Sequence, residues 1–292
     1  MNLPVMVPGL GRDALVEWCR RIDAGPWSHV AAGERITFPN PEILVTLSAA
    51  ALATERVDVF PHVIVLPMHD AVLVAKQLAT LDVLSGGRLR VGLGAGAREE
   101  DFRAIGADFG ARRVSRLAEQ AEVLRRTWSG APPFEGASRA VEPAPLRPGG
   151  PPLYAGSILP RAIERAAGWA DGLCGFSFGP DLPAIEQAFE TARRAWRAAG
   201  RPAPRLVTSF FYALGPEPEA QMERFIHRYL AFMGDDVAKR MAPQVRALSP
   251  DRLAGFLRGL RDLGADEVSL VATSLDPDEV DRAADVVASV AG

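Results

Sequence analysis

Glu34 and His62 are the residues best suited to proton transfer in this sequence. Glu34 follows an apolar run at residues 27–32, and His62 interrupts a second apolar run at residues 57–66. A carboxylate or an imidazole at such a place can exchange a proton with a bound substrate or orient its polar groups, so both are predicted as catalytic. Structural explanations stay open, namely an ion pair between Glu34 and Arg35 and a core histidine with satisfied ring nitrogens.

The other histidines and the two cysteines give weaker signals. His69 lies in a turn after the second apolar run, where exposure and function are equally compatible with its position, and His29 lies inside an expected strand. Cys19 and Cys174 stand far apart in apolar surroundings, which predicts buried thiols. The sequence has no HExxH, Cys-x-x-Cys or Walker A motif, so no metal site is predicted and P-loop chemistry is not expected.

Small residues end the apolar run at residues 89–93. Gly94, Ala95 and Gly96 follow it directly. Such residues allow a flat ring to lie close to the backbone, and the chemistry would then belong to a cofactor. Glycines that only permit close packing at the strand end are the structural alternative.

A second group of small residues, Ala155, Gly156 and Ser157, ends the run at residues 152–155 and precedes a helical pattern at residues 159–170. Free N–H groups and the helix dipole at such a junction favour a phosphate group. Helix capping alone is the alternative explanation of these residues.

Eight apolar runs, each followed by a helical segment, predict a single-domain (β/α)8 barrel over residues 1–292. Function in such a barrel lies at the carboxyl ends of the strands. An open doubly wound sheet is the alternative, because periodicity does not report closure. The expected strands are residues 3–7, 27–32, 57–66, 89–93, 152–155, 172–176, 205–214 and 267–272. The expected helices are residues 13–22, 41–53, 70–84, 98–109, 114–128, 159–170, 182–199, 217–233, 236–248, 249–263 and one that begins at residue 276.

Composition and net charge indicate which kinds of molecule this protein is expected to bind. The 292 residues are 48% hydrophobic and 24% charged, with a formal net charge of −3 and no basic stripe. These values argue against a nucleic-acid or membrane-surface role and favour a small-molecule substrate. No apolar run approaches the roughly 20 residues that span a bilayer, and the amino terminus does not resemble a signal peptide. A reducing cytoplasm is therefore the expected location.

Three segments in combination resemble a known family. Residues 71–98 read AVLVAKQLATLDVLSGGRLRVGLGAGAR, the similarity continues through residues 100–113, and it returns in Tyr-Ala-Gly-Ser at residues 154–157. Together they resemble the bacterial luciferase-like monooxygenases, including their coenzyme F420-dependent oxidoreductase branch. The resemblance covers most of the chain up to about residue 175 and only the general pattern beyond it.

The resemblance implies a (β/α)8 barrel that binds a deazaflavin or a flavin at the carboxyl ends of its strands. Coenzyme F420 is favoured and FMN is the alternative. In the family, a strand bulge with a non-prolyl cis peptide supports the ring, and the matching bond here is His62–Val63. The implied cofactor-binding residues are His62, Val63, Ile64, Val65, Gly94, Ala95, Gly96, Ala155, Gly156 and Ser157.

The activity implied is hydride transfer between the cofactor and an unidentified small organic substrate. One alternative is a two-component monooxygenase that uses FMN reduced by a partner flavin reductase. The other is a cofactor-binding barrel without turnover, because Gly33-Glu34 stands where many relatives have an Asp-His pair. The resemblance also implies a homodimer.

Overall fold

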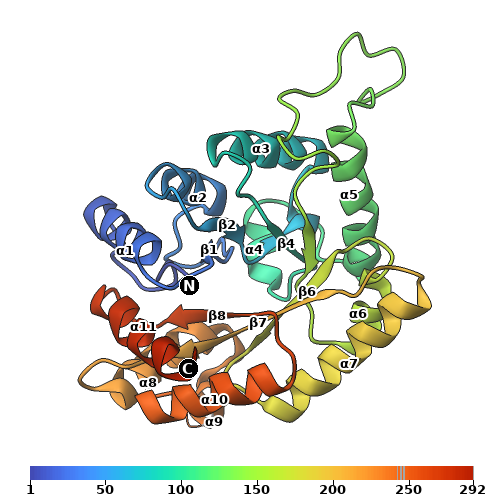
Figure 1. The fold of residues 1–292 in the computed structure, drawn as a ribbon. Coiled ribbons are helices and arrows are strands. Elements are labelled where there is room, and N and C mark those ends of the chain that lie inside the picture. Colours follow the sequence, from blue (N-terminus) through green and yellow to red (C-terminus); the bar gives the residue numbers. More distant parts are fainter. Residues whose placement is uncertain (242, 244, 246, 292) are drawn as a thin grey trace.

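Parallel strands alternate with helices along the chain in the computed structural model (Figure 1), which describes residues 1–241, 243, 245 and 247–291. The strands are β1 (His29–Ala32), β2 (Asp58–Pro61), β3 (Ile64–Val65), β4 (Val91–Gly94), β5 (Leu153–Ala155), β6 (Gly172–Ser177), β7 (Arg205–Tyr212) and β8 (Glu267–Ala272). The α-helices are α1 (Arg12–Ala24), α2 (Ile43–Leu52), α3 (Ala71–Leu84), α4 (Glu99–Ala104), α5 (Arg113–Trp128), α6 (Pro160–Ala166), α7 (Leu182–Ala198), α8 (Pro218–Leu230), α9 (Asp235–Met241), α10 (Pro250–Asp262) and α11 (Asp278–Ala291). Two 3-10 turns, η1 (Leu66–Met68) and η2 (Ala231–Met233), complete them.

The strand order follows the chain. β3 to β8 are hydrogen-bonded in sequence, each parallel to the next, and β1 pairs with β2. Isolated parallel bridges connect these two pieces, from Val59 to Leu89 and from Asn2 to both Ala31 and Val271. A doubly wound sheet reverses its strand order at a switch point, and the described strands show no reversal. The predicted α/β class and barrel order are therefore confirmed, although single-residue bridges rather than continuous ladders connect the ends.

Two strand predictions were wrong in detail. At residues 3–7, only the neighbouring Asn2 bridges other strands, because the chain turns where the N–H of Val7 donates to the Pro4 carbonyl at 3.0 Å. Proline supplies no N–H to continue a ladder. The run at residues 57–66 is divided into β2 and β3 by a break at residues 62–63.

The helix predictions held better where a cap defines the start. Asp70 accepts a hydrogen bond from the N–H of Leu73 at 2.8 Å and precedes α3, as the sequence predicts. The helix expected at residues 159–170 is shorter, since α6 begins only at Pro160 and ends at Ala166. The helix expected at residues 236–248 is present as α9, and residues 242, 244 and 246 of that prediction lie outside the described part of the chain.

The inside of the sheet has an apolar layer above a polar one. Phe60, Tyr154 and Cys174 belong to a small buried cluster, and burial raises the pKa of the Cys174 thiol. Below it, near the amino ends of the strands, Glu267 accepts a hydrogen bond from Arg90 at 2.6 Å and lies 3.1 Å from Nδ1 of His29. Both cysteines are buried and free, as predicted.

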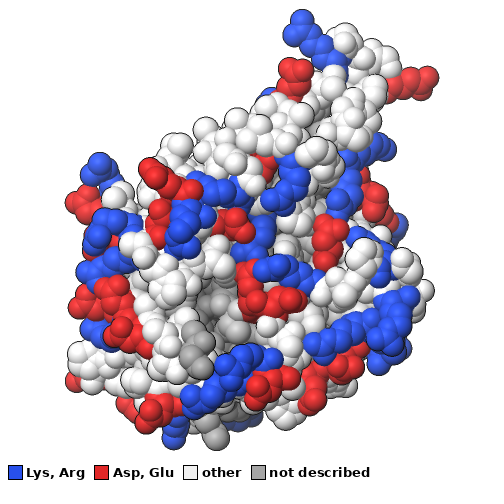
Figure 2. All heavy atoms as spheres, viewed as in Figure 1, with Lys and Arg blue, Asp and Glu red and all other residues white. Residues whose placement is uncertain are grey.

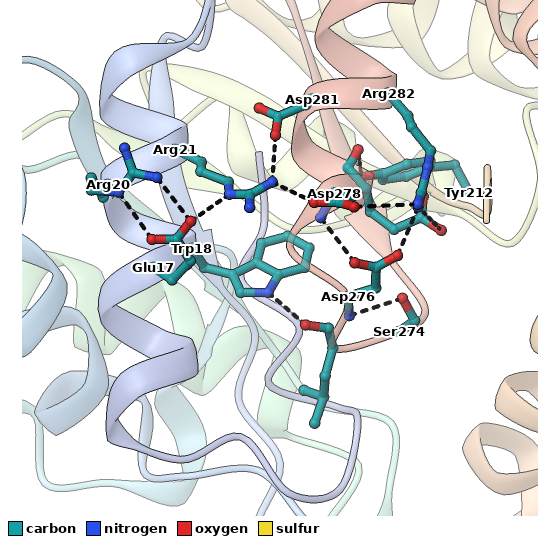
Figure 3. Close-up of polar contacts among 12 residues, drawn as sticks. Glu17, Trp18, Arg20, Arg21, Tyr212, Ser274, Asp276, Asp278, Asp281 and Arg282 are labelled. Atoms are coloured by element: carbon teal, nitrogen blue, oxygen red, sulfur yellow. Dashed lines mark hydrogen bonds and ion pairs between the residues drawn. The ribbon is translucent and has the colours of Figure 1, made fainter.

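The first and last helices are joined by polar contacts (Figure 3). The Arg21 guanidinium on α1 lies 2.7 Å from Asp278 and also pairs with Asp281 on α11. The indole N–H of Trp18 donates to the Leu275 carbonyl at 3.0 Å. These contacts bring the two ends of the chain together and hold the first and last β/α units side by side.

Residues 129–152 form a long connection, and the Pro- and Gly-rich composition of residues 130–151 predicts a loop there. It projects away from the strands between α5 and β5 (Figure 1). Its return is anchored where the N–H of Leu146 donates to the buried Asp82 carboxylate at 2.7 Å. None of the helices in the described residues is long and apolar enough to cross a membrane.

Candidate active site

The break between β2 and β3 is a bulge at the carboxyl end of the strands. The His62–Val63 peptide is cis, as the family resemblance predicts. The N–H of His62 donates to the Ala32 carbonyl at 2.7 Å, and the Val63 carbonyl accepts from the N–H of Glu34 at 3.2 Å. The bulge is thus tied on one side to β1 and to the residues that follow it.

His62 presents an imidazole without hydrogen-bond partners. Its ring stacks on Phe60 with centroids 4.9 Å apart, and both ring nitrogens are buried with no partner among the described residues. Burial lowers the pKa of His62 to about 4, although the backbone of Cys174 acts in the opposite direction. The imidazole is therefore neutral near pH 7, so one ring nitrogen can donate a hydrogen bond and the other can accept one.

Glu34 braces the bulge. One carboxylate oxygen accepts from the N–H of Val65 at 2.6 Å, and the other lies 2.8 Å from Nε2 of His69. The ion pair with Arg35, one of the explanations that the sequence leaves open, does not form among the described residues, since the carboxylate points to His69. Burial opposes protonation of His69, but the hydrogen bond and charge of Glu34 outweigh it and raise the pKa of His69.

Glu34 and His69 line a cavity of about 90 Å³ together with residues of α2 and α3. His62 does not line this cavity, and no hydrogen bond joins its ring to Glu34 in the described structure. The structure therefore places His62 on the bulge and Glu34 beside it, after β1, in different surroundings. The sequence prediction missed His69 as a partner of Glu34 because 35 positions separate them; that both follow expected strands was the only signal.

The glycines near the bulge make room for Val63. A Cβ atom added at Gly92, Gly94 or Gly156 would lie 3.0, 2.8 or 2.7 Å from a methyl group of Val63. Real Cβ atoms do not approach so closely, and a β-branched side chain has little freedom to turn away. Close packing, the structural alternative given for Gly94, thus accounts for that residue, and it also applies to Gly156, for which helix capping was the alternative.

Gly94→Ala is expected to destabilise the protein by about 1–3 kcal/mol, because the added methyl group overpacks the bulge. Val63→Ala in the same chain should recover part of that loss, since it removes the methyl group 2.8 Å away. Urea unfolding of the two single variants and the double variant measures this coupling. Strictly additive effects would contradict the packing described above.

The residues expected to hold a phosphate are partly committed elsewhere. The N–H of Gly156 donates to the Leu93 carbonyl at 2.8 Å, and that of Ser157 donates to the Ala155 carbonyl at 3.2 Å. The short helix α6 begins at Pro160, close to its predicted start, and Leu159 is its N-cap. What remains for an anion there is the Ser157 hydroxyl, which accepts from the Leu159 N–H at 3.2 Å and keeps its own hydrogen free.

A partly exposed floor surrounds the bulge. Half-buried side chains or glycines from three strand ends contribute to it. They are His62, Val63, Val65, Ala95, Gly96, Gly156 and Ser157. This floor combines small apolar surface with the unpartnered imidazole, a combination that suits a flat heteroaromatic ring. The described residues contain no group of three or more His, Cys, Asp or Glu placed to hold a metal ion.

Lowering the pH from 7 to 5 is expected to destabilise the fold through His62. Its pKa in the fold, about 4, lies below the ordinary value of 6.5, so the unfolded chain binds the extra proton first. Stability therefore rises with pH between these values, by at most about 1.4 kcal/mol per pH unit for one histidine. His62→Phe keeps the ring stack on Phe60 and should shrink the difference between urea unfolding at pH 7 and pH 5. An undiminished difference would show that His62 does not titrate in this way.

Comparisons with known proteins agree with this arrangement. The sequence profile of the luciferase-like monooxygenase family matches residues 7–290. The 4-hydroxyprotoasukamycin monooxygenase of Streptomyces nodosus subsp. asukaensis is 32% identical over 187 residues, which are 59% of this chain and 48% of that protein. The FMNH2-dependent dimethylsulfone monooxygenase of Pseudomonas putida is 28% identical over 230 residues, 76% of this chain and 58% of that protein.

The chain thus spans only about half the length of the curated relatives that it matches. Among solved structures, a coenzyme F420-dependent secondary alcohol dehydrogenase with a bound F420–acetone adduct superposes with a TM-score of 0.77. The alignment covers 94% of each chain at 15% identity, so this likeness concerns the fold. That fold is the barrel predicted from the strand count.

Proposed function

Because this chain belongs to the luciferase-like monooxygenase family, we propose that it is an oxidoreductase that binds a deazaflavin or a flavin over the bulge at His62–Val63. The observation that carries the proposal is that both buried ring nitrogens of His62, beside a floor of small residues, have no hydrogen-bond partner in the described part of the chain. A buried donor or acceptor without a partner is costly. A ring with polar edges would supply the missing partner.

The residues of the floor would hold such a cofactor by shape more than by charge. Val63 and Val65 would support the ring from below, with Ile64 buried behind them and Ala95 and Gly96 along its edge. The imidazole of His62 would hydrogen-bond to a polar edge of the ring, and the Ser157 hydroxyl would donate to the phosphate. The bound deazaflavin or flavin would supply the hydride chemistry.

Glu34 and His62 are the proposed acid–base residues. Glu34 is hydrogen-bonded to His69 at 2.8 Å. Its other oxygen is fixed by Val65, so Glu34 also positions the bulge. Coenzyme F420 is the favoured cofactor because the residues after β1 resemble that branch of the family.

An FMN-dependent two-component monooxygenase is the second candidate, favoured by the two monooxygenases among the similar proteins. In that case a partner flavin reductase supplies the electrons. For either reaction we propose that residues 1–292 form one barrel domain and that two copies pair as a homodimer, which light scattering of the purified chain tests.

Titration of the purified full chain with coenzyme F420 and with FMN tests the proposed function. Preferential binding of coenzyme F420, with bleaching of its absorbance on reduction, is the expected result. Preferential binding of FMN, with oxygen consumption when reduced FMN is supplied, would favour the monooxygenase. Binding without any turnover of the reduced cofactor would indicate a non-catalytic barrel, and binding of neither would refute the proposal.

A further inference from the structure

Arg35 lies shortly after the end of β1, against a group of aromatic rings. Its guanidinium carbon is 4.5 Å from the ring centroid of Tyr229 on α8. Phe38, in the segment after β1, and Phe232, in η2, lie at 6.0 and 5.9 Å. The preceding residue, Glu34, contacts the bulge through Val65, so Arg35 stands at the edge of the proposed cofactor site.

Among the described residues, Arg35 has none of the anionic partners that a neighbouring arginine has. Nη1 of Arg35 is buried and has no hydrogen-bond partner among the described residues. Arg98, by contrast, pairs with Asp101 and Glu100, each at 3.2 Å, and also lies over Phe232. Contact with aromatic rings compensates part of a buried positive charge but satisfies no N–H donor. The orphan donor on Arg35 therefore calls for an acceptor, and an oxyanion binds a guanidinium best.

An aromatic wall continues from Arg35 toward the carboxyl end of β6. The ring of Tyr229 lies 6.5 Å from Phe176, the penultimate residue of β6, and 6.0 Å from Phe178 beyond it. These three rings are partly exposed, and the buried Phe211 of β7 supports them from behind. Acidic and basic side chains alternate over the face seen in Figure 2, so the overall charge does not mark a site. The site is marked instead by the Arg35 guanidinium, which has no anionic partner among the described residues and lies beside an apolar wall.

We propose that Arg35 and this wall, formed by Phe176, Phe178 and Tyr229, bind the substrate of the proposed reaction, and that this substrate is an organic carboxylate with an apolar or aromatic body. The carboxylate pairs with the Arg35 guanidinium, and the body packs on the rings beside the bulge. This inference rests on the proposed function only where it calls the bound carboxylate a substrate. The binding site itself is inferred from the contacts of Arg35.

Benzoate and its neutral counterpart benzamide are the probes, titrated into the full chain by calorimetry. The wild type should prefer benzoate. Arg35→Gln should weaken benzoate binding about ten- to hundredfold and leave benzamide unchanged, as for loss of a charge-assisted hydrogen bond. Arg35→Lys keeps the charge without the planar fork and should bind benzoate with intermediate affinity. Arg103→Gln, an exposed arginine on α4, is the matched control and should behave as the wild type.

A wild type that does not prefer benzoate over benzamide would overturn the proposal, and this measurement needs no variant to fold. Equal benzoate affinities in the wild type and Arg35→Gln would overturn it as well. If Arg35 instead binds the phosphate of the cofactor, Arg35→Gln should bind FMN more weakly than the wild type and riboflavin equally well. That result would also refute the proposal. If the wild type binds neither coenzyme F420 nor FMN, the proposed function fails, but the benzoate titration still decides the role of Arg35.

Discussion

Glu267→Ala is expected to lower the free energy of unfolding by about 3–5 kcal/mol, the usual cost of leaving a buried charge without its partner. Glu267 is 8% exposed and pairs with Arg90, which is 7% exposed, at 2.6 Å. It also lies 3.1 Å from Nδ1 of His29. Burial alone would raise the pKa of Glu267, but hydrogen bonds from His29 and Arg90 lower it well below its ordinary range. The alanine variant leaves the His29 imidazole facing a cavity and leaves Arg90 with the half-exposed Asp58, 3.0 Å away, as its remaining carboxylate.

Urea unfolding at pH 7 measures the effect. Asp13→Ala removes a carboxylate from the fully exposed pair with Arg12 and should leave stability unchanged, which makes it the matched control. A Glu267→Leu and Arg90→Met double variant should recover most of the loss, since apolar residues of similar volume replace buried ion pairs at little cost. A single variant as stable as Asp13→Ala would show that this layer does not hold the amino ends of the strands together.

Glu34→Ala is expected to cost about 3 kcal/mol of stability, because it removes hydrogen bonds of a buried carboxylate to Val65 and His69. It should also weaken binding of coenzyme F420 or FMN at least about tenfold, since the freed bulge must be ordered again when the ring binds. Glu34→Gln retains an oxygen that can accept from the Val65 N–H. Its stability and its cofactor affinity should therefore lie between those of the wild type and those of Glu34→Ala. Urea unfolding and cofactor titration on the same preparations give both numbers.

Glu42→Ala is the matched control for Glu34. Glu42 lines the same cavity but caps α2, where its carboxylate accepts from the Val45 N–H at 2.6 Å. Loss of that cap should cost about 1 kcal/mol and leave cofactor binding unchanged. If Glu42→Ala weakens cofactor binding as much as Glu34→Ala does, the cavity and not the bulge controls that binding.

Local sequence patterns predicted the strands and helix starts that are set by residues adjacent in the chain. The run at residues 267–272 is β8 to the residue, and Asp70 begins α3 as its cap chemistry requires. The bulge was different, because the run at residues 57–66 carries no periodic sign of a break even where His62 interrupts it, and only the family resemblance indicated one. At residues 3–7, apolar character suggested a strand, but the turn after Pro4 prevailed.

The sequence predicted where the residues of the candidate site lie along the strands better than it predicted which of their side chains contact each other. Gly94 and Gly156 were expected near a ligand, and the structure shows that they make room for the side chain of Val63, a long-range contact that no spacing reveals. The pair Glu34–His69 and the rings around Arg35 likewise depend on how β1, α3 and α8 pack. Sequence periodicity places each element on the barrel but does not show which side chains meet.

A crystal structure of the full chain with bound coenzyme F420 or FMN tests most directly whether a cofactor ring lies on the bulge. The expected result is density for the ring against Val63, with a polar edge within hydrogen-bond distance of a His62 ring nitrogen. The phosphate should lie beside Ser157. Density in the cavity between α2 and α3, or a ring that leaves both His62 nitrogens without partners, would contradict the proposed site.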